Sequence, residues 1–209
     1  TLYKIMKKLL LIIFLIPILI IAQEKKDAEA QNNWYKKAEM ELNERQINRA
    51  FSSYRFAYEL LPESKTGKKS LKLSDSLKST LRKKLIRNIE GNWKIKILSK
   101  IKSEKDKKHY EKLGKFLRIT KDSIFYYTSK QNLKANDPNI SLKIKFCELM
   151  NYFPSYSDFL HSNNEIWNYN IDSTKSNLTI LNYGKIDNGG ESRTGNISHP
   201  SGYTYNRIK

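Results

Sequence analysis

The feature that most constrains the fold of this chain is a change in the spacing of its apolar residues at Gly91. Before this glycine, apolar side chains recur at every third or fourth position, which is the repeat of an α-helix with one buried face. After it, apolar and polar side chains alternate in short runs, as they do in β-strands with one buried face. The 209 residues are therefore predicted to fold in the α+β class, with a helical segment followed by an antiparallel sheet.

The N-terminal segment from Met6 to Gln23 is typical of a secretory signal peptide. Two lysines precede an apolar run, Leu9–Ile21, and the small residue Ala22 suits the position before a signal-peptidase cut. The run is shorter than the roughly 20 apolar residues that cross a bilayer, which favours removal over retention as an anchor. We expect residues 1–22 to be absent from the mature protein, which is then exported to the periplasm or the outside without a stable transmembrane anchor.

The part of the chain that follows this segment is strongly basic. Residues 23–209 hold 36 basic and 21 acidic side chains, a net charge of +15. Because we expect export, an anionic envelope component or a protein partner is a more natural partner than nucleic acid. A solvated exterior that only maintains solubility explains the charge equally well. The single cysteine, Cys147, excludes an internal disulfide and is interpreted as a partly buried, unreactive thiol.

Three helices are predicted between residues 23 and 90. The first follows a cap at Asn32 or Asn33, the second stops at Pro62, and the third carries leucine or isoleucine at every fourth position from Leu73 to Ile89. The opposite face of the third helix is basic. The predicted ranges are Trp34–Arg45, Ile47–Leu61 and Lys68–Ile89.

The first two predicted helices resemble a single tetratricopeptide repeat. Six positions match that family at its 34-residue period, namely Trp34, Ala38, Ala50, Tyr54, Ala57 and Pro62. The resemblance implies two closely packed helices, with the third helix covering one exposed face. A lone repeat cannot form the groove that tandem arrays use for peptides, so a generic three-helix bundle is an equal alternative.

Up to eight strands are predicted between Gly91 and Lys209, separated by turns. Their ranges are 92–99, 115–120, 123–129, 142–149, 165–171, 177–183, 191–194 and 203–208. No helical pattern lies between them, which favours an antiparallel barrel or sandwich. The longest irregular connection, residues 151–164, holds four aromatic residues and is expected to pack as a lid or a short helix.

The ends of this β-rich part carry a recognisable pair. It opens with Gly91-Asn92-Trp93 and closes with a predicted strand that contains Arg207. The arrangement resembles the lipocalin-like domains of exported bacterial proteins, in which the arginine of the last strand covers the tryptophan of the first. The resemblance implies a lipocalin-like β-barrel of about eight strands over residues 91–209. Gly91, Trp93 and Arg207 would then close the barrel and would not contact a ligand.

A set of apolar residues that alternate within their strands is a candidate for a ligand-binding lining. The set comprises Phe116, Phe125, Tyr127, Ile144, Phe146, Trp167 and Tyr169. In one interpretation these side chains surround a pocket for a small apolar ligand. In the other, which we favour, they fill one another's space as a dry core.

The sequence contains no constellation typical of catalysis. It has no H-E-x-x-H, G-x-S-x-G or Walker-type motif, and its three histidines, His109, His161 and His199, lack metal-ligand spacing and are interpreted as surface residues. We therefore expect no enzyme, cofactor or metal. Two functions remain: a carrier or sensor of a small apolar or amphipathic ligand, or an envelope scaffold that uses the repeat-like helices and the basic surface.

Overall fold

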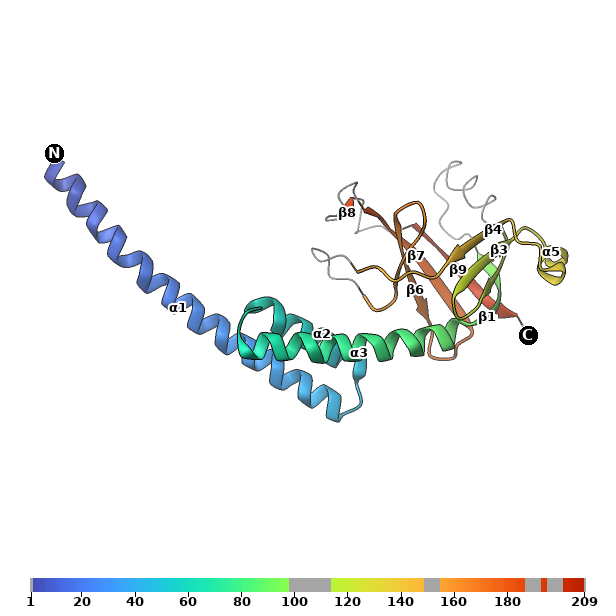
Figure 1. Ribbon diagram of the computed structural model, residues 1–209, viewed down its shortest axis with the longest axis horizontal. Coiled ribbons are helices and arrows are strands. Elements are labelled where there is room, and N and C mark those ends of the chain that lie inside the picture. Colours follow the sequence, from blue (N-terminus) through green and yellow to red (C-terminus); the bar gives the residue numbers. More distant parts are fainter. Residues whose placement is uncertain (1, 98–113, 149–154, 187–192, 195–200, 209) are drawn as a thin grey trace. The chain divides into compact units, whose positions relative to one another are not determined.

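The computed structural model describes residues 2–97, 114–148, 155–186, 193–194 and 201–208, with side chains from residue 23 onwards except those of residues 97, 193, 194 and 201. The chain divides into two compact units, Thr1–Leu81 and Arg82–Lys209. Helices form the first unit, and the second combines the end of a helix with a sheet (Figure 1). Among the described residues, no helix combines the length and hydropathy that crossing a membrane requires.

The first helix is longer than expected. Helix α1 is continuous from Leu2 to Asn43, so the predicted cap at Asn32 or Asn33 is wrong (Figure 1). Neither proline nor glycine occurs between residues 18 and 43, and the cost of two asparagines inside a helix is small. The predicted signal segment forms the first half of α1, and its side chains lie outside the described ones.

Helix α2, Ile47–Leu60, packs against α1 through small residues. Ala38, Ala50 and Ala57 are completely buried, which allows the two backbones to approach closely. The buried side chain of Gln31 donates hydrogen bonds to the carbonyl oxygens of Ala57 at 2.7 Å and Leu61 at 2.9 Å. These bonds satisfy carbonyls at the end of α2 that have no partner within the helix. The tetratricopeptide resemblance itself stays a prediction.

Helix α3, Lys65–Ile89, begins three residues earlier than predicted and ends where predicted. Leu81, Leu85 and Ile89 are buried. The basic residues of its other face are exposed, as expected; they are Lys69, Lys72, Lys83, Lys84 and Arg87. The part of α3 from Arg82 onwards belongs to the second unit, so the helix contributes side chains to the core of the sheet.

The second unit is a curled antiparallel sheet, which agrees with the predicted α+β class (Figure 1). The described strands are β1 Gly91–Ile97, β2 Phe116–Ile119, β3 Ser123–Tyr127, β4 Ile140–Lys143, β5 Asp158–Leu160, β6 Glu165–Ile171, β7 Asn177–Ile186, β8 Arg193–Thr194 and β9 Ser201–Ile208. Their order is β4-β3-β2-β1-β9-β7-β6-β5, with β8 added beside β7. The first and last strands, β1 and β9, are direct neighbours.

Two elements were missed by the sequence analysis. The short helix α5, Lys130–Ala135, is capped by Ser129, whose side chain accepts a hydrogen bond from the backbone N–H of Asn132. Strand β5 lies within the connection that was expected to be a lid or a helix, and that expectation is wrong for residues 158–160. Residues 149–154 of the same connection lie outside the described ones.

The segment that follows β4 joins the two ends of the strand order. It leaves β3 and pairs instead with β5, where Leu160 N–H donates to Lys145 O at 2.7 Å and Cys147 N–H donates to Asp158 O at 2.9 Å. An antiparallel bridge lies between these two bonds. The sheet thus curls until its two end strands meet through residues 145–147, a contact that we call the seam.

The main hydrophobic core lies on one face of the curled sheet. Its largest side chains, Trp93, Tyr169, Tyr205 and Phe159, are at most 1% exposed. Leu85 and Ile89 of α3 belong to the same core. Because strand side chains alternate between faces, β2 and β3 place a second, smaller cluster on the other face, where it packs with Leu133 of α5.

Candidate functional site

The predicted neighbours Trp93 and Arg207 are directly paired across β1 and β9. The guanidinium carbon of Arg207 lies 4.3 Å from the centre of the Trp93 ring, a distance at which a cation is attracted to the face of an indole. The ring nitrogen of Trp93, which is completely buried, donates to Ile89 O at 2.8 Å. The pair therefore ties the end of α3 to the meeting point of the first and last strands.

Arg207 also accounts for the glycine at the start of β1. Its guanidinium donates to the carbonyl oxygens of Glu90 at 2.9 Å and of Asn88, which lie at the C-terminus of α3, where such groups lack helical partners. Gly91 has φ +136°, and a Cβ atom there would come within 3.0 Å of Arg207 Nη1. The φ angle favours glycine, and a side chain there would also displace the guanidinium. The role of these three residues is structural.

The seven predicted lining residues do not form one set. Ile144, Phe146, Trp167 and Tyr169 lie in the main core. The other three, Phe116, Phe125 and Tyr127, lie in the second cluster on the opposite face, beneath α5. The sequence shows which residues of a strand lie on the same face. It does not show which face of one strand adjoins a given face of another, because the pairing of strands sets the register.

The core residues of this set pack against one another. The ring centres of Phe146 and Phe159 are 4.9 Å apart, and those of Phe159 and Tyr169 are 4.4 Å apart. Trp167 stacks on Tyr203, with 6.0 Å between ring centres. These contacts favour a filled core at this part of the sheet over a large apolar void.

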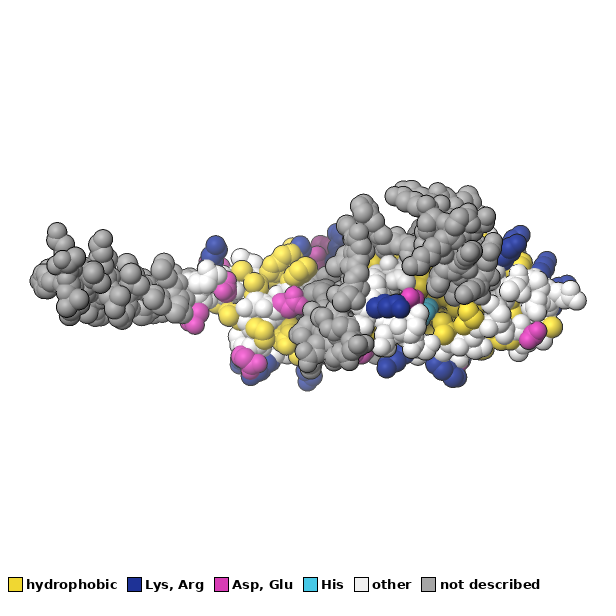
Figure 2. Space-filling view, turned by 90° about the horizontal axis from the view of Figure 1, so that it is seen from above, with side chains coloured by type: hydrophobic (Ala, Val, Ile, Leu, Met, Phe, Trp, Pro, Cys, Tyr) yellow, Lys and Arg dark blue, Asp and Glu magenta, His cyan; other side chains and the backbone are white. Residues whose placement is uncertain are grey.

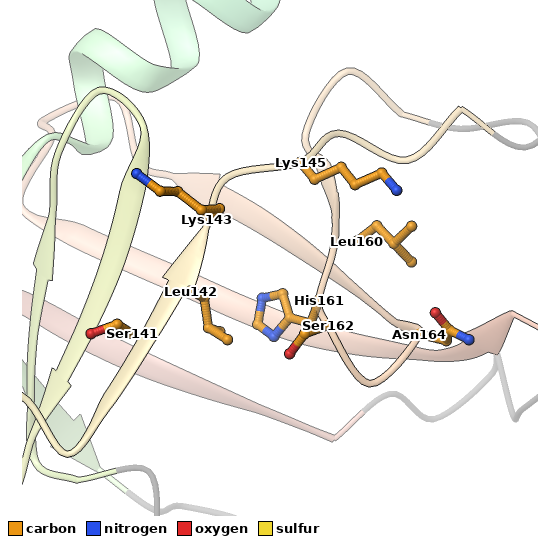
Figure 3. A pocket seen from close by; sticks show the side chains of 8 residues that line it. All are labelled: Ser141, Leu142, Lys143, Lys145, Leu160, His161, Ser162 and Asn164. Carbon is orange, nitrogen blue, oxygen red and sulfur yellow. The ribbon is translucent and has the colours of Figure 1, made fainter.

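A pocket of about 370 Å³ opens beside the seam of the curled sheet. Its walls come from two segments, one running from β4 to Lys145 and the other from the end of β5 into the turn before β6 (Figure 3). The lining residues are Ser141, Leu142, Lys143, Lys145, Leu160, His161, Ser162 and Asn164. We call this the seam pocket. It exists because the chain switches partners from β3 to β5 after Lys143 and leaves the two strands apart on one side of the switch.

His161 connects the seam pocket to the core. Its ring stacks on Trp167, with 5.4 Å between ring centres, and its Nε2 atom lies 3.2 Å from the hydroxyl oxygen of Tyr169. That hydroxyl is in turn 3.4 Å from the hydroxyl of Tyr126. The earlier interpretation of His161 as a surface histidine is wrong, since its ring is partly buried between the pocket and the core. His109 and His199 lie outside the described residues.

Burial sets the ionisation of the hydrogen-bonded side chains of His161, Tyr169 and Tyr126. It lowers the pKa of His161 to about 4, against a smaller opposing effect of the Glu165 carboxylate. It also raises the pKa of Tyr126 to about 12 and that of Tyr169 well above its usual value. All three groups are therefore uncharged at neutral pH, and His161 presents a neutral imidazole to the pocket.

The carboxylates near the seam pocket are engaged by other groups. Asp122 pairs with Lys143 at 3.5 Å, and hydrogen bonds from Ser123 and Thr120 lower its pKa. Glu165 accepts a hydrogen bond from the Trp167 ring nitrogen at 3.0 Å. Neither acid lines the pocket, and the charged side chains among its described lining residues are those of Lys143 and Lys145.

None of the residues that line the seam pocket was predicted from the sequence to belong to a site. The alternation of the predicted strand 142–149 included Leu142, Lys143 and Lys145, but nothing in the sequence placed them opposite His161. Within the described part of the chain, no group of His, Cys, Asp and Glu side chains is arranged to hold a metal ion. Cys147 is buried beside Ile166, on the other side of its strand from the main core.

Comparisons with known proteins returned no relative: no family model, no curated protein and no solved structure matches the chain.

Proposed function

We propose that this chain is an exported, non-catalytic binding protein whose second unit is a lipocalin-like β-barrel that holds a small amphipathic ligand. Support for the barrel comes from the contact between β1 and β9, the Trp93–Arg207 stack and the seam that joins the two ends of the strand order. Support for export comes from the signal-like segment at Met6–Gln23. Mass spectrometry of the mature protein, with Gln23 as the expected first residue, tests the export.

The observation that carries the binding function is the seam pocket. Its volume, about 370 Å³, falls in the range of small-molecule sites, roughly 300–1,000 Å³. Leucine side chains line it together with hydroxyl, amide and imidazole groups, a mixture that suits a ligand with apolar and polar parts. The ligand site proposed here is therefore the seam pocket and not the packed core.

The test is a fluorescence titration of the full chain with 1-anilinonaphthalene-8-sulfonate, a small amphipathic probe. We expect saturable binding of one probe per chain. The variant Ser162→Trp places an indole in the pocket from an exposed turn and is expected to weaken the affinity by about tenfold or more, since it takes up the space of the probe. Ser173→Trp, in the exposed turn between β6 and β7, is the matched control and is expected to leave the affinity unchanged. Equal affinity in both variants, or no saturable binding, contradicts the proposed function.

The alternative, an envelope scaffold, is favoured by one observation in the first unit. Met40 and Phe56 are large apolar side chains that are 63% and 44% exposed. In contrast, basic side chains lie at many separate places on the face seen in Figure 2 and do not gather over one element. A scaffold therefore finds more support in the apolar residues of the helices than in the charge. If the probe titration fails, this alternative becomes the stronger hypothesis.

A further inference from the structure

We infer that the ligand of the seam pocket is a small organic anion, a carboxylate with a short apolar portion. The inference rests on the proposed function, because it names the chemical class of ligand for the same site. It is argued from the charge, the apolar walls and the hydrogen-bonding groups of the pocket.

The charge of the lining favours an anion. Among the described residues, the pocket is lined by two lysines and by no acidic side chain. Neither lysine side chain points toward the His161 ring in Figure 3, and Lys143 is paired with Asp122 at 3.5 Å. Lys145 has no ion-pair partner among the described residues, so its positive charge is not compensated there. A carboxylate in the pocket would supply that compensation, and a cationic ligand would be repelled.

The apolar walls limit the rest of the ligand. Leu142 and Leu160 stand on the two segments that form the pocket, so each segment contributes an apolar side chain to its lining (Figure 3). The volume of about 370 Å³ accommodates a chain of several carbons but not a large lipid. A carboxylate with a short alkyl portion fits both features.

His161 adds a directional hydrogen bond. Its Nε2 atom is engaged by the Tyr169 hydroxyl, while Nδ1 has no hydrogen-bond partner among the described residues. When the Tyr169 hydroxyl donates a hydrogen bond to Nε2, the proton of the neutral imidazole lies on Nδ1, which then serves as a donor. An anion selects this tautomer, and Tyr126 completes the chain by donating to the Tyr169 oxygen.

The test compares three probes that share an eight-carbon chain and differ in charge: octanoate, octan-1-ol and octyltrimethylammonium. Each is titrated against the full chain loaded with 1-anilinonaphthalene-8-sulfonate at pH 7.5. We expect octanoate to displace the fluorescent probe at a concentration about tenfold lower than octan-1-ol, and the cation to be the weakest competitor. Added salt is expected to weaken the binding of octanoate and to leave the binding of octan-1-ol unchanged.

A charge-removing variant locates the effect. Lys145→Met keeps most of the length of the side chain and removes its charge. It is expected to weaken the binding of octanoate by about three- to tenfold and to leave the binding of octan-1-ol unchanged. Lys94→Met, at an exposed position on β1 outside the pocket, is the matched control. Equal competition by octanoate and octan-1-ol, or failure of octanoate to compete, overturns the inference while the site itself stands. Loss of saturable probe binding would instead overturn the proposed function.

Discussion

At the scale of single residues, Trp93 and Arg207 connect three parts of the second unit. The indole is completely buried, donates to the last turn of α3 and is covered by the guanidinium. The guanidinium in turn donates to two carbonyls at the end of α3 and, at 2.9 Å, to Lys175 O in the turn between β6 and β7. One residue thus satisfies backbone groups from a helix and a distant turn, which only a side chain with several fixed donors can do.

The first prediction concerns the indole. Trp93→Ala removes the largest fully buried side chain among the described residues and leaves a cavity, so we expect a loss of about 3–5 kcal/mol in the free energy of unfolding. Urea denaturation followed by circular dichroism measures it. Trp34→Ala, at a half-buried tryptophan of the first unit, is the control and is expected to cost clearly less. An unchanged urea denaturation curve for Trp93→Ala would contradict its role in closing the sheet.

At the scale of elements, α3 belongs to both units. Its residues up to Leu81 lie in the first unit, and its last two turns contribute Leu85 and Ile89 to the core of the sheet. Arg82 in the second unit pairs with Glu148 and lies over the ring of Phe146 at 4.3 Å from the ring centre. The helix end is therefore held by the segment that forms the seam as well as by β1.

The second prediction tests this contribution of α3. Leu85→Ala and Ile89→Ala each remove a buried branched side chain and are expected to destabilise the second unit by about 2–4 kcal/mol. Tryptophan fluorescence reports the unfolding, because Trp93 and Trp167 both lie in this core. Lys84→Ala, on the exposed face of the same helix, is expected to stay within about 0.5 kcal/mol of the unchanged protein. Losses no larger than that of the control would show that the helix end is not part of the core.

At the scale of the whole molecule, the balance between folded and unfolded chains depends on pH through His161. Its pKa is lowered to about 4 in the folded protein, against about 6.5 in an unfolded chain. Between these two values the unfolded chain binds a proton that the folded protein does not, so unfolding becomes more favourable as the pH falls. The contribution of the neutral histidine is complete above pH 6.5 and is lost as the pH falls towards 4.

The third prediction follows from this linkage. The free energy of unfolding is expected to fall by up to about 3 kcal/mol between pH 7 and pH 4.5 because of His161. His161→Phe keeps a ring against Trp167 and removes the titrating group. The free energy of unfolding of this variant is therefore expected to change less with pH over this interval. Asp172, whose pKa the hydrogen bonds from Asn177 and Ser176 lower to about 2, titrates below the interval and does not interfere. Identical profiles for the two proteins would contradict the assignment.

The pattern of apolar residues determined most of the elements. The repeat of three and four before Gly91 identified three helices. The alternation after it identified strands, and β6 was predicted with its observed bounds. The glycine, tryptophan and arginine that meet between β1 and β9 were also identified, because their chemistry requires a partner and closure of a sheet brings its ends together. The signal cleavage, the ligand class and the two family resemblances stay predictions.

What the sequence alone determined is therefore local: the period of each segment, its breaks and the residues that need a stacking or capping partner. Only the tertiary structure decided which side chains share a face and where a pocket opens. Phe125 and Trp167 were predicted to line one site but lie in different clusters, since the pairing of strands decides which residues of different strands share a face. The seam pocket likewise depends on a change of strand partner between Lys143 and Lys145, which no local pattern encodes because both partners are distant along the chain.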